Sequence, residues 1–210
     1  MQKINESTLY RKGLRKKIID AAMMLFKEKG IKAVKMDDIA SHLSISKRTL
    51  YEIFDNKEDL LLEGVKANME KQHQDMERFR AEHDDVLQII LFFYRMKLIE
   101  IGSVHAAFFL DMKKYKKVTD YFNSQKMEQK NSALAFFARG VEEGYFLPQL
   151  NYDIVTRLGE AAMDYVMSAK MYEEFALKDI FRNFVSVLLR GYCTEKGQAV
   201  LNAELWNEAK

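Results

Sequence analysis

Residues that interrupt helices are scarce in this chain, and their scarcity constrains its fold more than any other feature. The 210 residues include one proline, Pro148, and nine glycines. Proline and glycine are the strongest punctuators of turns and loops, and the β-branched alternation typical of strands is rare. Apolar residues instead recur at intervals of three and four, as they do on one face of a helix. The sequence therefore predicts an all-α protein.

Four helix starts are expected between the N-terminus and Leu60. The first helix ends just before Gly30, because glycine readily takes the left-handed conformation that closes a helix. The carboxylates of Asp37 and Asp38 favour the positive end of a second, short helix. A third and a fourth helix are expected to begin at the capping residues Ser46 and Asn56. The N-terminal part of the chain is thus built from short elements.

The rest of the chain predicts longer and more apolar helices. Charge changes along with helix length: residues 1–57 hold 13 Lys/Arg and 7 Asp/Glu, whereas the remaining residues hold 20 and 24. A local basic excess is typical of a small anion-binding module carried on a body with another role. We expect an N-terminal domain at 12–72 and a C-terminal helical bundle at 73–210. The later helices are predicted at about 57–81, 84–101, 104–112, 116–143, 151–171 and 176–193.

Several classes of protein do not fit this composition. One cysteine, Cys193, allows neither an intrachain disulfide nor a cysteine-based zinc site. The apolar run from Ile89 to Tyr94 spans six residues, far short of the roughly 20 that cross a bilayer. The first residues of the chain carry charge and form no apolar stretch, so they do not resemble a secretory signal. We expect a cytoplasmic protein that spans no membrane and holds no metal or cofactor.

Residues 35–54, KMDDIASHLSISKRTLYEIF, have the anatomy of a helix-turn-helix. Ala40 is small where the two short helices must cross closely, and Ser44 and Ser46 provide the turn and the cap. The polar side chains that remain crowd the start and the outer face of the second short helix, which is the part that meets a major groove. The buried seam is expected to comprise Ile39, Leu43, Ile45 and Leu50.

Five side chains of this region suit contacts with double-stranded DNA. Arg48 can donate two hydrogen bonds to a guanine edge, and Thr49 can touch a thymine methyl group or a phosphate. The Tyr51 hydroxyl and the Lys47 ammonium suit phosphates. Lys57, at the start of the fourth helix, can join free backbone amides in binding a phosphate, so that it positions the protein without reading bases. For the basic residues of the first helix, Arg11, Lys12, Arg15, Lys16 and Lys17, a solvated helix face fits equally well on charge alone.

The run from about residue 12 to residue 72 resembles the DNA-binding domain of TetR-type transcriptional regulators. It carries LFKEKG at the end of the opening helix, then DDIA, then the most specific part, SISKRTLYEIFDNKEDLL. The resemblance implies that residues 46–51 form the recognition helix and that Tyr51 and Lys57 contact the DNA backbone. It also implies that the larger C-terminal domain dimerises and binds an inducer. By motif, the resemblance covers only the first third of the chain.

Two positions depart from the family pattern. Lys35 stands where the family usually has a threonine or serine that caps the second helix and often touches a phosphate. A lysine cannot cap by accepting a hydrogen bond, although it can still meet the phosphate. Ser44 replaces the glycine common in the turn, so it is strained if its φ is positive. Neither change removes the DNA-facing chemistry.

The C-terminal part is rich in phenylalanine and tyrosine, which can line a ligand cavity. At helical spacing such residues more often form the core. Core packing is therefore the alternative to the ligand hypothesis. Arg95 interrupts the apolar run from Val86 to Ile101; it can bind a carboxylate or lie on an outer face. The candidate ligand-binding residues are Arg95, Phe109, Phe137 and Tyr165.

The last two long helices have wide apolar faces that contain small residues. Two such helices, paired with their symmetry mates, make a four-helix interface between identical subunits, and the resemblance favours this arrangement over packing within one subunit. A two-fold homodimer requires a palindromic operator. The apolar positions are Val155, Leu158, Ala162 and Tyr165, followed by Ile180, Phe184, Val187, Leu188 and Gly191.

Catalysis is not expected. Glu70 and His73 have the helical spacing of carboxylate-bridged di-iron sites, but no second such pair exists in the sequence. No histidine lies near Cys193, and there is no glycine loop to cradle a phosphate. We therefore expect a DNA-binding transcriptional regulator, a repressor released from its operator by a small, apolar effector. The alternative is a helical DNA-binding or protein-interaction module that needs no ligand.

Overall fold

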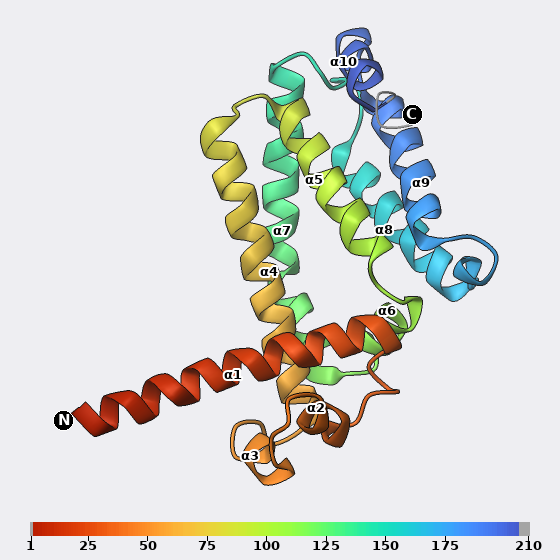
Figure 1. Cartoon of the computed structure of the whole chain (residues 1–210). Coiled ribbons are helices and arrows are strands. Elements are labelled where there is room, and N and C mark those ends of the chain that lie inside the picture. The colour runs from red at the N-terminus through yellow and green to blue at the C-terminus, as the bar shows by residue number, and fades with distance from the viewer. Residues whose placement is uncertain (1, 206–210) are drawn as a thin grey trace. The chain divides into compact units, whose positions relative to one another are not determined.

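The computed structural model describes residues 2–205, and this part of the chain is helical, with one isolated β-bridge between Phe146 and Cys193 (Figure 1). The all-α prediction is confirmed. None of the described helices combines the length and the apolar character needed to cross a membrane. The elements are α1 (Gln2–Lys29), α2 (Met36–His42), α3 (Lys47–Tyr51), α4 (Lys57–Glu82), α5 (Val86–Gly102), α6 (Ala106–Met112), α7 (Lys116–Glu142), α8 (Tyr152–Ser168), the 3₁₀ helix η1 (Met171–Glu173), α9 (Leu177–Tyr192) and α10 (Glu195–Leu205).

Most helix ends lie where the capping residues predicted them. Gly30 has a φ of +84° and closes α1 by donating its N–H to the Phe26 carbonyl at 2.9 Å. Asn56 caps α4 by accepting the Asp59 N–H at 2.9 Å. One prediction was too long: α8 ends at Ser168, because Lys170 takes a left-handed conformation that a continuous helix excludes.

The chain forms two compact units that do not follow one cut in the sequence. The N-terminal unit contains the residues up to His73 together with Ser103–Ser124, and the C-terminal unit contains Gln74–Gly102 together with the residues from Gln125 on. Helices α4 and α7 each contribute residues to both units. The N-terminal unit thus includes α6, although this helix lies well beyond the predicted boundary at 72.

The core of the N-terminal unit is formed by the apolar face of α1 and the helices that cover it. Ile18, Ala22 and Phe26 are fully buried, and their spacing places them on one side of α1. Ile39 of α2 and Leu50 of α3 are equally inaccessible to solvent and belong to the same cluster. The short helices therefore depend on α1 as a platform.

Helix α6 holds the end of α1 and the turn that follows it. The His105 N–H donates to the Lys27 carbonyl at 2.8 Å. Asp111, only 6% exposed, accepts the Lys32 N–H at 2.7 Å and pairs with Lys114 at 2.9 Å. Burial acts to raise the pKa of the Asp111 carboxyl, but these two donors together hold it below its ordinary value. α6 is thus attached to the end of α1 by a backbone hydrogen bond and to the turn after it by the Asp111 carboxylate.

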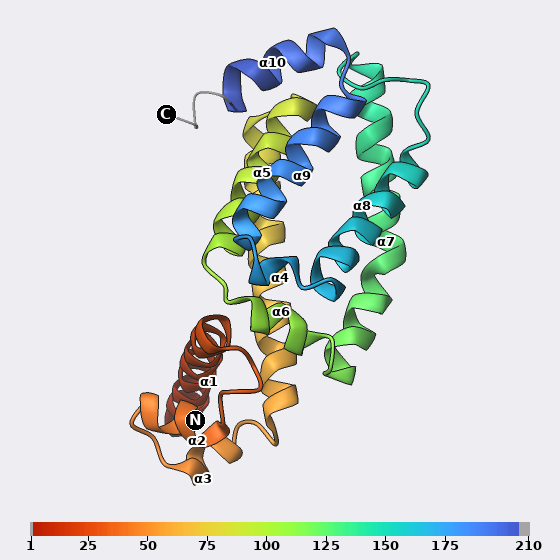
Figure 2. The same ribbon diagram turned by 90° about the vertical axis from the view of Figure 1, so that its right-hand side faces the viewer.

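The C-terminal unit packs around Phe146. α5 lies beside α9 in both ribbon views (Figures 1 and 2), and the Phe146 ring lies among the rings of Phe137, Tyr152 and Tyr192, with centroids 5.2 to 6.4 Å away. A Cβ on Gly140 would lie 2.0 Å from the Phe146 ring, so this position requires glycine. Burial at the edge of this cluster raises the pKa of the Cys193 thiol to about 12, which leaves it unreactive at neutral pH.

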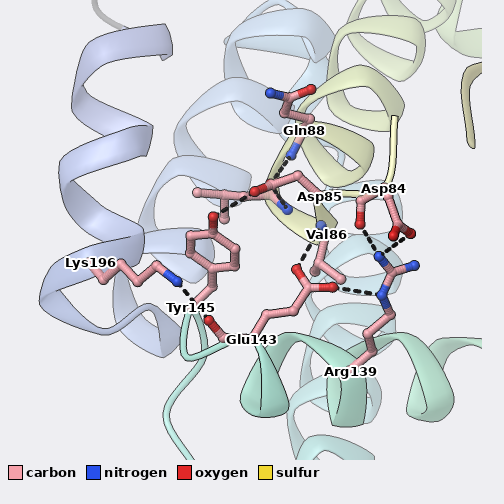
Figure 3. A network of polar contacts seen from close by, with 9 residues as sticks. Asp84, Asp85, Val86, Gln88, Arg139, Glu143, Tyr145 and Lys196 are labelled. Carbon is pink, nitrogen blue, oxygen red and sulfur yellow. Dashed lines mark hydrogen bonds and ion pairs between the residues drawn. The ribbon is translucent and has the colours of Figure 1, made fainter. Parts of the chain in front are cut away.

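A polar network in this unit joins the turn between α4 and α5 to the end of α7 (Figure 3). Asp85 accepts the Leu87 N–H at 2.8 Å, which caps α5, and also the Tyr145 hydroxyl at 2.5 Å. That hydrogen bond raises the pKa of Tyr145 to about 12. Glu143 accepts the Val86 N–H at 3.0 Å. The network therefore ties the start of α5 to the end of α7.

Candidate DNA-binding interface

Helix α2 begins without a side-chain cap from the residue that precedes it. Lys35 has an extended backbone (φ −96°, ψ 160°) and its side chain accepts no hydrogen bond. Instead, the Asp38 carboxylate reaches back to accept the Lys35 N–H at 2.7 Å. This is half of a capping box, and it shows how a lysine is tolerated at this position. The Lys35 side chain is exposed to solvent.

The turn between α2 and α3 requires a positive φ at a residue that is not glycine. Ser44 has a φ of +53°, the left-handed conformation that the sequence identified as a source of strain. Its N–H donates to the Ser41 carbonyl at 3.1 Å, and the Ile45 N–H donates to the Ala40 carbonyl at 3.0 Å. These hydrogen bonds hold the tight turn that sets α3 across α2.

Helix α3 is capped as predicted and has two distinct sides. The Ser46 hydroxyl accepts the Thr49 N–H at 3.0 Å and also pairs with the Thr49 hydroxyl at 2.7 Å. Leu50 points into the core and is fully buried, whereas Tyr51 is 42% exposed. Because the inner side is anchored through Leu50, the outer side presents its polar groups to solvent.

The exposed cations of α3 are held loosely by acidic neighbours. The Arg48 side chain is 89% exposed and forms an ion pair with Glu52, one turn further along the chain, at 3.0 Å. Lys47 pairs with Asp37 of α2 at 2.9 Å, and this contact raises the pKa of Lys47. Exposed pairs of this kind contribute little to stability, so both cations can exchange a carboxylate for another anion.

Lys57 plays a structural part that the sequence did not reveal. Its ammonium donates to the carbonyls of Ile31 and Val34, both at 2.9 Å, and so fastens the start of α4 to the turn after α1. Partial burial lowers the pKa of Lys57. Two of its three N–H groups are thus engaged within the protein. Helix periodicity gives no sign of this contact, because its two acceptors are backbone carbonyls from a distant part of the sequence.

Arg15 of α1 is a second cation that supports the interface. Its guanidinium pairs with Glu63 at 2.7 Å, donates to the Ile53 carbonyl at 3.5 Å, and lies 4.5 Å from the centroid of the Phe54 ring. Ile53 and Phe54 follow α3 closely in the chain. α1 is therefore attached to the end of the helix-turn-helix by a cation as well as by apolar packing.

The four candidate ligand residues lie in different surroundings. Phe109 belongs to the N-terminal unit, where it packs against the core. Phe137 stacks on Tyr152, with centroids 4.6 Å apart, inside the aromatic cluster of the C-terminal unit. Arg95 is half-buried on α5, and Tyr165 is 65% exposed on α8. Among the described residues, no group of three or more acidic, histidine or cysteine side chains is placed to hold a metal ion.

Comparisons with known proteins agree with this geometry. Residues 18–63 match the family model described as bacterial regulatory proteins, tetR family. The transcriptional repressor KstR2 of Mycobacterium tuberculosis is 27% identical over 149 residues, which cover 68% of this chain and 74% of that protein. IcaR of Staphylococcus aureus, a negative regulator of the biofilm operon icaADBC, is 43% identical over 54 residues, 26% of this chain and 29% of its own length.

Solved structures extend the similarity to the whole fold. A putative transcriptional regulator from Saccharomonospora viridis, solved in complex with choline, has a TM-score of 0.70 at 20% identity and covers 88% of this chain and 100% of that one. The structure of the ketosteroid transcriptional regulator KstR2 of Mycobacterium tuberculosis has a TM-score of 0.58 at 20% identity, and the match covers 86% of this chain and 95% of that one. The segment that matches the tetR family model contains α2 and α3, so the helix-turn-helix lies in the part of the chain that is similar to tetR-family regulatory proteins.

The strain at Ser44 leads to a stability prediction. Ser44→Gly is expected to raise the free energy of unfolding by up to about 1 kcal/mol, because glycine takes a positive φ without a Cβ clash. Ser41→Gly, also at an exposed position but within α2, should lower it by about 0.5 kcal/mol, because glycine is a poor helix former. Urea unfolding measures both values. An equal loss in the two variants would show that Ser44 is not strained.

Proposed function

We propose that this protein is a transcriptional repressor that binds a palindromic operator as a homodimer and leaves it when a small, apolar effector binds. The observation that carries the DNA-binding part is the two-sided α3, in which Leu50 is buried while Arg48 and Tyr51 face solvent. A recognition helix needs this arrangement, because the side chains that read bases must project away from the core.

On this proposal the residues of α3 comprise a base reader, two phosphate contacts and one side chain that can take either role. Arg48 is the base reader, since a guanidinium can donate two hydrogen bonds to a guanine edge. Lys47 and Tyr51 bind phosphates. Thr49 contacts a thymine methyl group or a phosphate, although its hydroxyl is shared with Ser46.

The two remaining candidate contacts lie outside α3. Lys35 is exposed at the start of α2 and reaches a phosphate with its ammonium. Lys57 keeps one N–H group beyond the two that it donates to carbonyls, and that group can meet a phosphate oxygen. Its main role on this account is to hold the turn after α1, so that removing it would disturb folding as well as DNA binding.

Exposed apolar side chains on α8 and α9 support the homodimer. Ile154, Leu158 and Tyr165 lie along one face of α8 and are 54%, 61% and 65% exposed, and Val187 of α9 is 72% exposed. A Cβ on Gly159 would lie 3.9 Å from Phe184 and Leu188, so α8 and α9 pack together beside this face. Several exposed apolar side chains on one side of a helix are typical of a protein–protein interface. The occupant proposed here is a second copy of the chain, related by two-fold symmetry.

The effector is proposed to bind in the C-terminal unit, where the aromatic side chains gather. Phe137 offers a flat apolar face, and Arg95 and Tyr165 offer polar groups at positions nearer to solvent. The similarity to the ketosteroid regulator KstR2 supports an apolar effector, whereas the similarity to a regulator solved with choline favours a cationic one. Aromatic rings suit both kinds of ligand.

Release requires that the effector prefer one of two conformations. A ligand shifts such an equilibrium only by its difference in affinity for the two states, so a 100-fold loss of operator affinity needs a difference of about 2.8 kcal/mol. α6 is suited to pass on a change, because it follows α5 directly in the chain and is fastened to the turn after α1 through Asp111 and His105. A shift of α6 would therefore move the platform on which α2 and α3 rest.

The role of Arg48 can be tested on a duplex selected by the wild-type protein from random DNA. Arg48→Ala should weaken binding to this duplex by about 1–3 kcal/mol and relax the base preference at the contacted position. Lys47→Ala, the neighbouring phosphate contact, should weaken binding to all duplexes alike. Competition binding with single-base variants of the duplex measures both effects. Unchanged preference in Arg48→Ala would refute the assignment.

The homodimer can be tested by placing charge on its proposed interface. Val187→Glu combined with Leu158→Glu should convert the dimer to a monomer, because four carboxylates would be brought into one apolar contact. Ile99→Glu is the matched control, since Ile99 is 73% exposed on α5 outside the proposed face. Light scattering during size-exclusion chromatography gives the mass of each. A monomeric wild type, or dissociation by Ile99→Glu as well, would contradict the proposal.

The effector hypothesis is tested by release of the selected duplex. We expect a steroid to displace the protein from the duplex and to raise its melting temperature in the absence of DNA, whereas choline is the probe for a cationic effector. Fluorescence anisotropy of the labelled duplex gives the displacement. If neither these probes nor a broad panel of apolar compounds releases the duplex, the alternative of a ligand-independent DNA-binding module is favoured.

A further inference from the structure

The N-terminal half of α1 has a charge that its packing does not explain. Residues 7–19 contain five Lys/Arg and no acidic residue. One of them, Arg15, is engaged with Glu63 and with the segment that follows α3. The other four are exposed, and none forms an ion pair or hydrogen bond with another side chain that the structure describes: Arg11, Lys12, Lys16 and Lys17.

The helix carries one of these cations, Arg11, past the helix-turn-helix on the side that faces it. Arg11 precedes Arg15 by four positions and Ile18 by seven, so all three lie on one face of α1. Arg15 contacts Ile53 and Phe54, and Ile18 is fully buried. Arg11 therefore lies about 6 Å, roughly one helical turn, beyond the contact with the segment that follows α3.

No other part of the N-terminal unit that the structure describes covers this end of the helix. α1 spans 28 residues, and its N-terminal half extends past α2, α3 and α4 (Figure 1). Arg11 lies on the same face of α1 as the buried residues Ile18 and Ala22, but nearer to the N-terminus, where this face is exposed. Lys12 lies beside it, and Lys16 follows Lys12 by one turn. A basic side chain thus replaces an apolar one at the point where protein contact stops.

We propose that Arg11 and Lys12, flanked by Lys16, bind backbone phosphates of the operator just outside the base pairs that α3 reads. The proposal rests on α3 being the DNA-reading helix. The occupant is argued from charge: B-DNA carries one negative charge per about 1.7 Å of its axis, and the cluster offers cations without local acidic partners among the described residues. Such contacts position the protein and add affinity without adding base preference.

The test measures the salt dependence of binding to a selected duplex that extends at least ten base pairs beyond the selected sequence on each side. Each phosphate contact removed should reduce the slope of log K against log salt by about one. In a two-fold dimer, Arg11→Gln should therefore reduce it by about two and the Arg11→Gln, Lys12→Gln double variant by about four. Lys17→Gln is the matched control, because Lys17 lies on another face of α1, and it should leave the slope near the wild-type value.

Two further measurements separate this proposal from the function on which it rests. Shortening the duplex to the bases read by α3 should remove the difference between wild type and the double variant. The base preference of the double variant should stay that of the wild type, while Arg48→Ala changes it. An unchanged slope in the double variant, with normal sequence selection, would overturn the α1 contact alone. An equal loss of slope in Lys17→Gln would assign the effect to net charge and overturn it as well. A wild-type protein that selects no duplex would overturn both the α1 contact and the proposed function.

Discussion

The exposed side of the helix-turn-helix depends on the burial of Leu50. A helix as short as α3 is unstable in water by itself, because the conformational entropy lost in forming the first turn outweighs the hydrogen bonds that one turn contributes. α3 persists because Leu50 inserts into the cluster below α1 and because Ser46 caps its first turn. The same insertion determines which side of α3 faces solvent. The chemistry of the interface is therefore a consequence of packing on its opposite side.

The platform under α3 is completed from a distant part of the sequence. α6 supplies Phe108 to the core, and its residue Asp111 is the only buried charged side chain found among the described residues. A buried carboxylate is costly unless it is paired and hydrogen-bonded, and Lys32 and Lys114 satisfy it here. Gly30 is needed at the same place for a second reason, since a Cβ there would lie 2.8 Å from the Ala107 Cβ. α6 and the turn after α1 thus fit each other closely.

The C-terminal unit combines an aromatic centre with a polar rim. Gly140 allows the ring of Phe146 to approach α7, and the ring cluster around it excludes water. At the rim, Arg139 bridges Glu143 and Asp84 (Figure 3). Lys196 of α10 donates to the Glu143 carbonyl at 2.8 Å and lies over the Tyr145 ring. The start of α5, the end of α7 and α10 are held together by these contacts.

The sequence by itself determined the helical class, most helix ends and the two-sided character of α3. Those properties arise from local spacing and from caps that act within one helical turn, as at Gly30, Ser46 and Asn56. Only the tertiary structure decided that Lys57 fastens the turn after α1, that α6 joins the N-terminal unit, and that Phe109 packs against the core of that unit. These outcomes depend on backbone carbonyls and on pairings between residues far apart in the chain. A helical pattern records which face is apolar, but not which partner covers it.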